Sequence, residues 1–189
     1  MLLPQSVSTN KNLSRYPDKY EIFDDAFNFN DVTFFHSFFI KDTVYRIGWP
    51  DRYDTFNKQY MHSMFSLKDM DDIGFLKRIK NNRLLELIGG RTPVRMVVNV
   101  TSPSYVFYQH AHTNQDSLVY YANTEWPKEW AGETMIYEDN GIDILTCIPF
   151  VPGRVLWLKN QVIHALRPPS AMADVHRLTF ACFFDNPQV

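Results

Sequence analysis

Two histidines one residue apart mark the segment with the clearest potential for chemistry. His110 and His112 stand in YQHAHTNQD, and Asp116 follows four residues after the second histidine. Side chains two apart on a β-strand point to the same face, so both imidazoles would project together. If residues 113–115 form a turn, Asp116 would lie across from His112 on the returning strand. Two imidazoles and a carboxylate suit Fe(II), Mn(II) or Zn(II) and leave coordination positions open.

Three further candidates lie nearer the C-terminus. His164 begins a later predicted strand after PGRVLWLKNQVI, and in a jelly roll such a strand lies beside the one with the first ligands. Arg177 and Thr179 alternate onto one face of the last predicted strand, RLTFACFF. A guanidinium beside a hydroxyl suits a carboxylate, because its planar fork donates two parallel charge-assisted hydrogen bonds. The simpler alternatives are a histidine pair on an ordinary polar face and a solvated arginine at a strand end.

The elements that would position these residues change character near the middle of the chain. Residues 31–42, which Asn30 could cap, and residues 67–90, which end at Gly89 and Gly90, have apolar side chains at helical spacing. From Arg95 onward, short alternating segments are separated by turn signals such as TSPS, DNG and VPG. The predicted strands are residues 95–100, 105–112, 117–123, 133–139, 144–150, 154–160, 163–168 and 177–184. Strands without intervening helices predict a mainly β protein with N-terminal helices, arranged as a jelly roll of the cupin kind.

Length and composition limit the possible classes of protein. A chain of 189 residues that is 45% apolar and 15% aromatic can bury a core, so we expect one domain over residues 1–189. Within it, residues 1–94 would form a helical or supporting region, and residues 95–185 would form the β core. Between the predicted helices, residues 43–56 and 59–65 could be strands or ordered loops. The 19 basic and 21 acidic residues form no block of like charge, so nucleic acid binding is not indicated.

The sequence also gives expectations about compartment. It has no apolar stretch long enough to span a membrane, and its N-terminus lacks the features of a signal peptide. Cys147 and Cys182 lie in apolar segments and are expected to be buried reduced thiols. We therefore expect a cytoplasmic protein without a membrane partner, whose oligomeric state the sequence does not indicate.

Three segments, in this order, resemble the Fe(II)/2-oxoglutarate-dependent oxygenases of the prolyl-hydroxylase-like branch. SLVYYANTEWPKEWAGETMIYED is similar to the branch's Y-x-N…W…GGET segment, PGRVLWLKNQVIHALRP to its PGR…H segment, and RLTFACFF to its R-x-[ST] strand. The similarity covers about residues 95–185. With YRIGWPDR near the start, the whole chain looks most like oxygenases common in tailed-phage and marine viral sequences. The resemblance implies a double-stranded β-helix.

The resemblance also implies an activity and roles for individual residues. Fe(II) would be the metal, and 2-oxoglutarate and O2 the cosubstrates. His164 would be the distal histidine ligand, and Arg177 with Thr179 would bind the far carboxylate of 2-oxoglutarate. Tyr121, in the Y-x-N position, would be a second cosubstrate contact. The implied reaction hydroxylates an unactivated C–H bond of an amino-acid, peptide or small-molecule substrate and releases succinate and CO2.

The proximal ligands depart from the family's pattern. The family has H-x-D or H-x-E where this chain has H-A-H-T-N. The set His110/His112/His164 keeps the usual spacing without a cross-strand reach, and we rank it ahead of His112/Asp116/His164. Asn114 in the carboxylate position would be a poorer ligand for Fe(II). In the preferred set, Asp116 would be a fourth ligand or would accept a hydrogen bond that orients a histidine.

Two other functions are compatible with the residues. A cupin-like metal dioxygenase or isomerase that does not use 2-oxoglutarate would bind metal through the same histidines but would give Arg177 no role. A non-catalytic jelly-roll binding module would not bind metal tightly.

Overall fold

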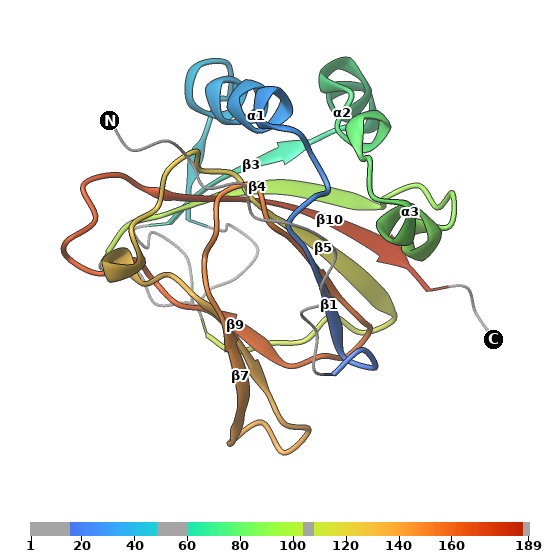
Figure 1. Cartoon of the computed structure of the whole chain (residues 1–189), viewed down its shortest axis with the longest axis vertical. Helices are drawn as coiled ribbons and strands as arrows, with labels where there is room; N and C mark the ends of the chain where they lie inside the picture. The colour runs from blue at the N-terminus through green and yellow to red at the C-terminus, as the bar shows by residue number, and fades with distance from the viewer. Residues whose placement is uncertain (1–15, 49–59, 104–107, 187–189) are drawn as a thin grey trace.

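A computed structural model describes residues 16–48, 60–103 and 108–186, and these residues form three layers (Figure 1). Helices cover one face of a large antiparallel sheet, and a smaller sheet lies against its other face. The helices are α1 (Phe29–Lys41), α2 (Leu67–Ile73), the short 3-10 helix η1 (Leu76–Arg78) and α3 (Asn82–Ile88), and a second 3-10 helix, η2 (Lys128–Trp130), lies in a loop. The expected mainly β architecture with N-terminal helices is confirmed.

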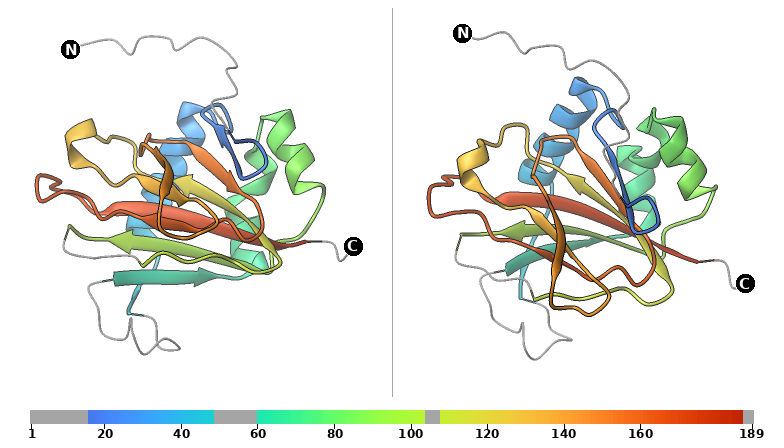
Figure 2. Two further views of the ribbon diagram at one scale, coloured as in Figure 1. Left: turned by 90° about the horizontal axis from the view of Figure 1, so that it is seen from below. Right: turned by 60° about the horizontal axis from the view of Figure 1, so that its bottom comes forward.

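The two sheets have the strand arrangement of a double-stranded β-helix. The large sheet has the order β1-β8-β5-β10-β4-β3-β2, and the small sheet has the order β7-β6-β9; every pairing is antiparallel. The strands are β1 (Tyr20–Phe23), β2 (Arg46–Ile47), β3 (Tyr60–Phe65), β4 (Arg95–Thr101), β5 (Gln115–Tyr121), β6 (Thr134–Tyr137), β7 (Ile144–Ile148), β8 (Val155–Leu158), β9 (His164–Leu166) and β10 (Arg177–Asp185). Figure 2 shows the β6–β7 hairpin crossing in front of the large sheet.

The N-terminal half differs from the sequence prediction in three respects. It contributes an unexpected strand, β1, to the large sheet, whereas β2 and β3 form within the two segments that were expected to be strands or ordered loops. Helix α1 begins earlier than predicted, because Asn28 rather than Asn30 caps it by accepting a hydrogen bond from the Asp31 backbone N–H at 2.8 Å. The predicted helix over residues 67–90 is divided, since Gly74 ends α2 in a left-handed conformation and Asn81 caps α3. Gly89 ends α3, as predicted.

One predicted strand of the C-terminal half is largely absent from the described structure. Of residues 105–112, the first three lie outside the described residues, and only His110 forms an isolated bridge. The other seven predicted strands correspond to β4 through β10. Both cysteines are free, but Cys147 is exposed, contrary to expectation, while Cys182 is buried. None of the helices in the described ranges has the length and apolar character needed to cross a bilayer.

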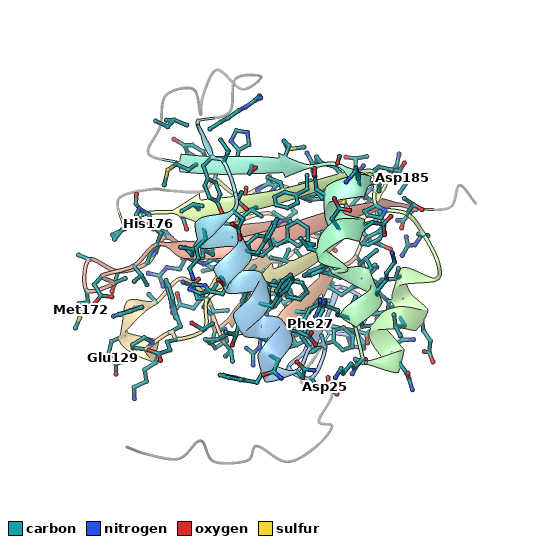
Figure 3. The ribbon with its side chains drawn as sticks, turned by 90° about the horizontal axis from the view of Figure 1, so that it is seen from above. Asp25, Phe27, Glu129, Met172, His176 and Asp185 are labelled. Carbon is teal, nitrogen blue, oxygen red and sulfur yellow. The ribbon has the colours of Figure 1, made fainter. Side chains whose placement is uncertain are left out.

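The large sheet has an outer face under the helices and an inner face toward the small sheet. Along β10, Phe180, Cys182 and Phe184 point outward into an aromatic core with the helices, where Phe75 and Phe180 lie edge to face with ring centroids 4.7 Å apart. Figure 3 looks onto this face and shows Phe27 in the same layer. The alternate residues of β10 point inward, because side chains alternate along a strand. The inner face therefore holds the functional candidates of this strand.

Candidate metal centre and carboxylate site

Three of the predicted ligands converge at one end of the inner face. His110 and His164 form an antiparallel bridge in which each backbone N–H donates to the other's carbonyl at 2.9 Å. Their ring centroids lie 4.4 Å apart, and the His112 ring lies 4.9 Å from His110 and 5.4 Å from His164. One ring nitrogen of each lies within 4.8 Å of the others, and no other group of three or more possible ligands occurs in the described part of the chain. Metal–nitrogen bonds of about 2.1 Å would draw these nitrogens slightly closer around one ion.

Hydrogen bonds to backbone carbonyls orient two of the three imidazoles. His164 Nδ1 lies 2.9 Å from the Val162 carbonyl oxygen, and His110 Nδ1 lies 3.0 Å from the Tyr108 carbonyl oxygen. A carbonyl oxygen only accepts, so each Nδ1 carries the proton and donates it. Nε2 of each ring is then the unprotonated nitrogen, which is the form that binds a metal.

The environment keeps the two more buried imidazoles neutral. Burial lowers the pKa of His164 to about 3, and the neighbouring His110 adds to the shift. Burial likewise lowers the pKa of His112 to about 3, with contributions from His110 and from Arg95. Arg95 lies over the Phe183 ring at 3.8 Å, and that ring contacts His112 with centroids 4.6 Å apart. A neutral imidazole is the form that binds metal, so this group suits a cation at neutral pH.

Asp116 does not join the histidines, which corrects the expected cross-strand placement. It pairs with Phe184 in the ladder between β5 and β10, and Phe184 belongs to the outer core. Its carboxylate therefore points toward the helices, where it forms an ion pair with Arg91 at 3.0 Å and accepts the Asn160 backbone N–H at 3.0 Å. Of the two ligand sets considered, only His110/His112/His164 is brought together by the fold.

Arg177 lies at the other end of the inner face of β10. Its side chain is fully buried; Nε donates to the Gly132 carbonyl at 2.9 Å, and the guanidinium lies 4.9 Å from the Phe150 ring centroid and 5.5 Å from that of Tyr121. The two terminal nitrogens have no hydrogen-bond partner among the described residues. Burial lowers the pKa of Arg177 to about 10, while Tyr121 and Glu133 partly oppose that shift. The group is therefore a buried cation at neutral pH with two free donors.

Tyr121 contacts this guanidinium, and Thr179 lies two residues from Arg177 on the same face of β10. The Thr179 Oγ1 is buried and has no partner among the described residues, and Thr179 pairs directly with Tyr121 on β5. The Tyr121 hydroxyl is 2.7 Å from the Thr134 Oγ1, and burial raises its pKa, so its phenol is neutral. The terminal nitrogens of Arg177 and the Thr179 hydroxyl are groups that can bind a carboxylate, and we call these two residues the carboxylate site.

Sequence reasoning missed the residues that hold Arg177. Gly132 supplies the acceptor for Nε and Phe150 supplies the ring beneath the guanidinium, but neither residue type indicates such a contact by itself. In that region the sequence offered one indication of function, the similarity of AGET to a segment of the oxygenase family. That similarity did not predict a contact between Gly132 and Arg177.

No family model matches this sequence, and a search of curated proteins finds no match either. Solved structures do match. A Pseudomonas putida prolyl-4-hydroxylase has a TM-score of 0.62 at 12% identity, covering 90% of this chain and 95% of its own. HygX from Streptomyces hygroscopicus, with nickel and 2-oxoglutarate bound, has a TM-score of 0.65 at 15% identity, covering 95% and 88%. The viral collagen prolyl hydroxylase of Paramecium Bursaria Chlorella virus-1 has a TM-score of 0.58 at 14% identity, covering 98% and 100%. These identities establish a shared fold.

Proposed function

We propose that this protein is an Fe(II)- and 2-oxoglutarate-dependent dioxygenase that hydroxylates a C–H bond of an amino-acid, peptide or small-molecule substrate. The observation that carries the proposal is Arg177, a fully buried cation whose terminal nitrogens have no partner among the described residues. Unpartnered buried donors cost free energy, so their retention points to a ligand that completes them. The shared fold with 2-oxoglutarate-binding HygX supports 2-oxoglutarate as that ligand.

The residues would divide the work between the two ends of the inner face. His110, His112 and His164 would hold Fe(II), and Arg177 with Thr179 would bind the far carboxylate of 2-oxoglutarate. The Tyr121 ring, stacked on Phe150 with centroids 4.5 Å apart, would form an apolar wall that excludes water. Bound Fe(II) would supply the oxidising chemistry, in which one atom of O2 would enter the substrate C–H bond and the other would enter succinate as 2-oxoglutarate loses CO2.

A centre of three neutral imidazoles differs in charge from the family's usual centre with one carboxylate. The protein would neutralise none of the ion's two positive charges, so the ion would attract anionic ligands more strongly. 2-Oxoglutarate carries two carboxylates, one for the metal end and one for Arg177. The departure in the ligand set is therefore compatible with an anionic cosubstrate.

The histidine group by itself also suits a cupin-like metal dioxygenase or isomerase that uses no 2-oxoglutarate. That function leaves the buried guanidinium without a role, whereas the proposed function uses both of its free donors. A binding module without metal would leave the matched orientation of His110 and His164 unexplained.

Succinate formation tests the proposal. The protein, loaded with Fe(II) under anaerobic conditions, is given 2-oxoglutarate and O2, and succinate is measured with and without candidate substrates. We expect 2-oxoglutarate-dependent succinate from the wild type, and its loss in Arg177→Met, which keeps an apolar stem but removes the whole guanidinium, including the Nε that donates to Gly132. Tight metal binding without any 2-oxoglutarate binding would favour the cupin-like alternative. Absence of metal binding would favour the binding module.

A further inference from the structure

The Arg177 side chain reaches the carboxylate site with little conformational freedom. Its Nε is bound to the Gly132 carbonyl at 2.9 Å, and its guanidinium packs over Phe150. Only the terminal nitrogens face the site without a partner in the described residues. A guanidinium fixed in this way cannot follow ligands of different length.

The loop that fixes Arg177 has no space for a side chain at position 132. Gly132 has φ +83°, and a Cβ placed there would lie 3.2 Å from Arg177 Cδ and 3.2 Å from Trp126 Cζ2. Both contacts are tighter than ordinary van der Waals packing, so both side chains, or the loop itself, would have to move by a few tenths of an ångström. Glycine is required here for its backbone conformation and for this close approach.

Several hydrogen bonds hold the same loop, residues 126–133, in place. Trp126 Nε1 donates to the Ala131 carbonyl at 2.8 Å, and the Ser170 backbone N–H donates to the Trp130 carbonyl at 2.7 Å. The Ser170 Oγ donates to the Glu129 carbonyl at 2.9 Å. Figure 3 shows Glu129 and Met172 together at one end of the sheet, and Asp185 at the other. The loop is therefore tied to the segment that precedes β10.

We infer that the 126–133 loop is a positioning device that sets the reach of Arg177 and thereby the length of the 2-oxo acid accepted. This inference rests on the proposed function and deepens it. Gly132 and Trp126 are positioning residues that act through Arg177. Moving the guanidinium by a few tenths of an ångström would weaken binding of 2-oxoglutarate more than binding of 2-oxoadipate, its homologue with one more methylene group.

The test compares Gly132→Ala with Ala131→Gly. Calorimetry measures 2-oxoglutarate and 2-oxoadipate binding to the full chain loaded with Zn(II), which needs no turnover. In G132A the Kd for 2-oxoglutarate should rise roughly 10- to 100-fold, the effect of losing a hydrogen bond to a charged group. The preference for 2-oxoglutarate over 2-oxoadipate should fall, and Zn(II) affinity should stay unchanged. In turnover with Fe(II), KM for 2-oxoglutarate should rise with little change in kcat.

Ala131→Gly is the matched control. Ala131 has φ +56°, which glycine adopts more readily, and the substitution adds no atom against Arg177. It should keep wild-type affinity and preference for both oxo acids. Trp126→Phe keeps a ring but removes the Nε1–H donor. Like G132A, it should lower the preference for 2-oxoglutarate over 2-oxoadipate, but by a smaller factor.

The outcomes separate this inference from the proposed function. Wild-type protein that binds no 2-oxoglutarate would overturn both. Wild-type protein that binds it, with G132A binding both oxo acids at wild-type affinity, would overturn the inference alone. If G132A does not fold, Trp126→Phe decides, and an unchanged preference in that variant overturns the inference.

Discussion

The two faces of β10 use the same backbone for different purposes. On the outer face, Phe180, Cys182 and Phe184 are completely buried in the core beneath the helices. On the inner face, Arg177 and Thr179 are equally buried but keep polar atoms without partners among the described residues. Burial is therefore not what distinguishes the two faces. One face satisfies its side chains by packing, and the other holds polar groups ready for a ligand.

Charged groups show the same contrast. On the outer face, the Asp116 carboxylate is paired with Arg91, so the charge is compensated within the protein. On the inner face, the Arg177 guanidinium contacts a carbonyl and aromatic rings and forms no ion pair within the described ranges. Outer-face substitutions should consequently affect stability, and inner-face substitutions should affect binding.

The largest expected effect is on the outer face. Phe180→Ala should lower the free energy of unfolding by about 3–5 kcal/mol, because a fully buried ring is replaced by a cavity. Urea denaturation measures the loss. Metal affinity of the folded protein should not change, and a metal-binding defect at temperatures where the variant is folded would contradict the separation of the two faces.

On the inner face, His164→Ala should lower metal affinity by at least about 100-fold, since even the partners that orient a metal ligand contribute factors of 10–100. Equilibrium dialysis with Zn(II) or Mn(II) measures it. The control is His36→Ala on α1, whose Nδ1 bonds to the Ala122 carbonyl at 3.0 Å away from the centre. Equal metal affinity in His164→Ala and the wild type would exclude this histidine as a ligand.

Protonation of the same histidine should link the inner face to stability. In the metal-free folded protein, burial lowers the pKa of His164 to about 3, below the value of a histidine in the unfolded chain. As pH falls, the imidazole is therefore protonated in the unfolded chain before it is protonated in the folded protein, which favours unfolding. Stability should be full above about pH 6.5 and fall by ~1.4 kcal/mol per pH unit below it, until the folded pKa is reached. Urea denaturation at pH 7.5 and 5.5 measures this. His164→Gln should show a shallower dependence, and an identical slope would show that His164 does not contribute.

The smallest effect tests the rejected ligand set. Asp116→Asn should cost ~1 kcal/mol of stability through loss of the partly exposed pair with Arg91. It should leave metal affinity and stoichiometry at wild-type values. A large loss of metal affinity would instead support His112/Asp116/His164 and would require Asp116 to turn from the outer face to the inner one.

Local sequence patterns were sufficient for much of the β core. Alternation of apolar residues and turn signals correctly located all the segments that form β4 to β10. The same signals also predicted a strand over residues 105–112, where the described residues form only an isolated bridge at His110. The capping residue of α1 and the break at Gly74 were missed, because several asparagines and glycines satisfy the same local rules. β1 was missed because a short strand of the sequence YEIF gains its stability from pairing with β8, whose residues lie 132 to 138 positions later in the chain.

The sequence by itself determined which residue types were available for chemistry: an H-x-H pair, a later histidine, and an arginine two residues before a threonine. The tertiary structure decided which of them meet. Asp116 is four residues from His112, yet the register of β5 against β10 turns it to the opposite face. His164 is 54 residues from His110, yet a backbone bridge places their rings 4.4 Å apart. Because side chains alternate with a period of two, a strand's register assigns each of them to the site or to the core, and register is fixed only when the sheet assembles.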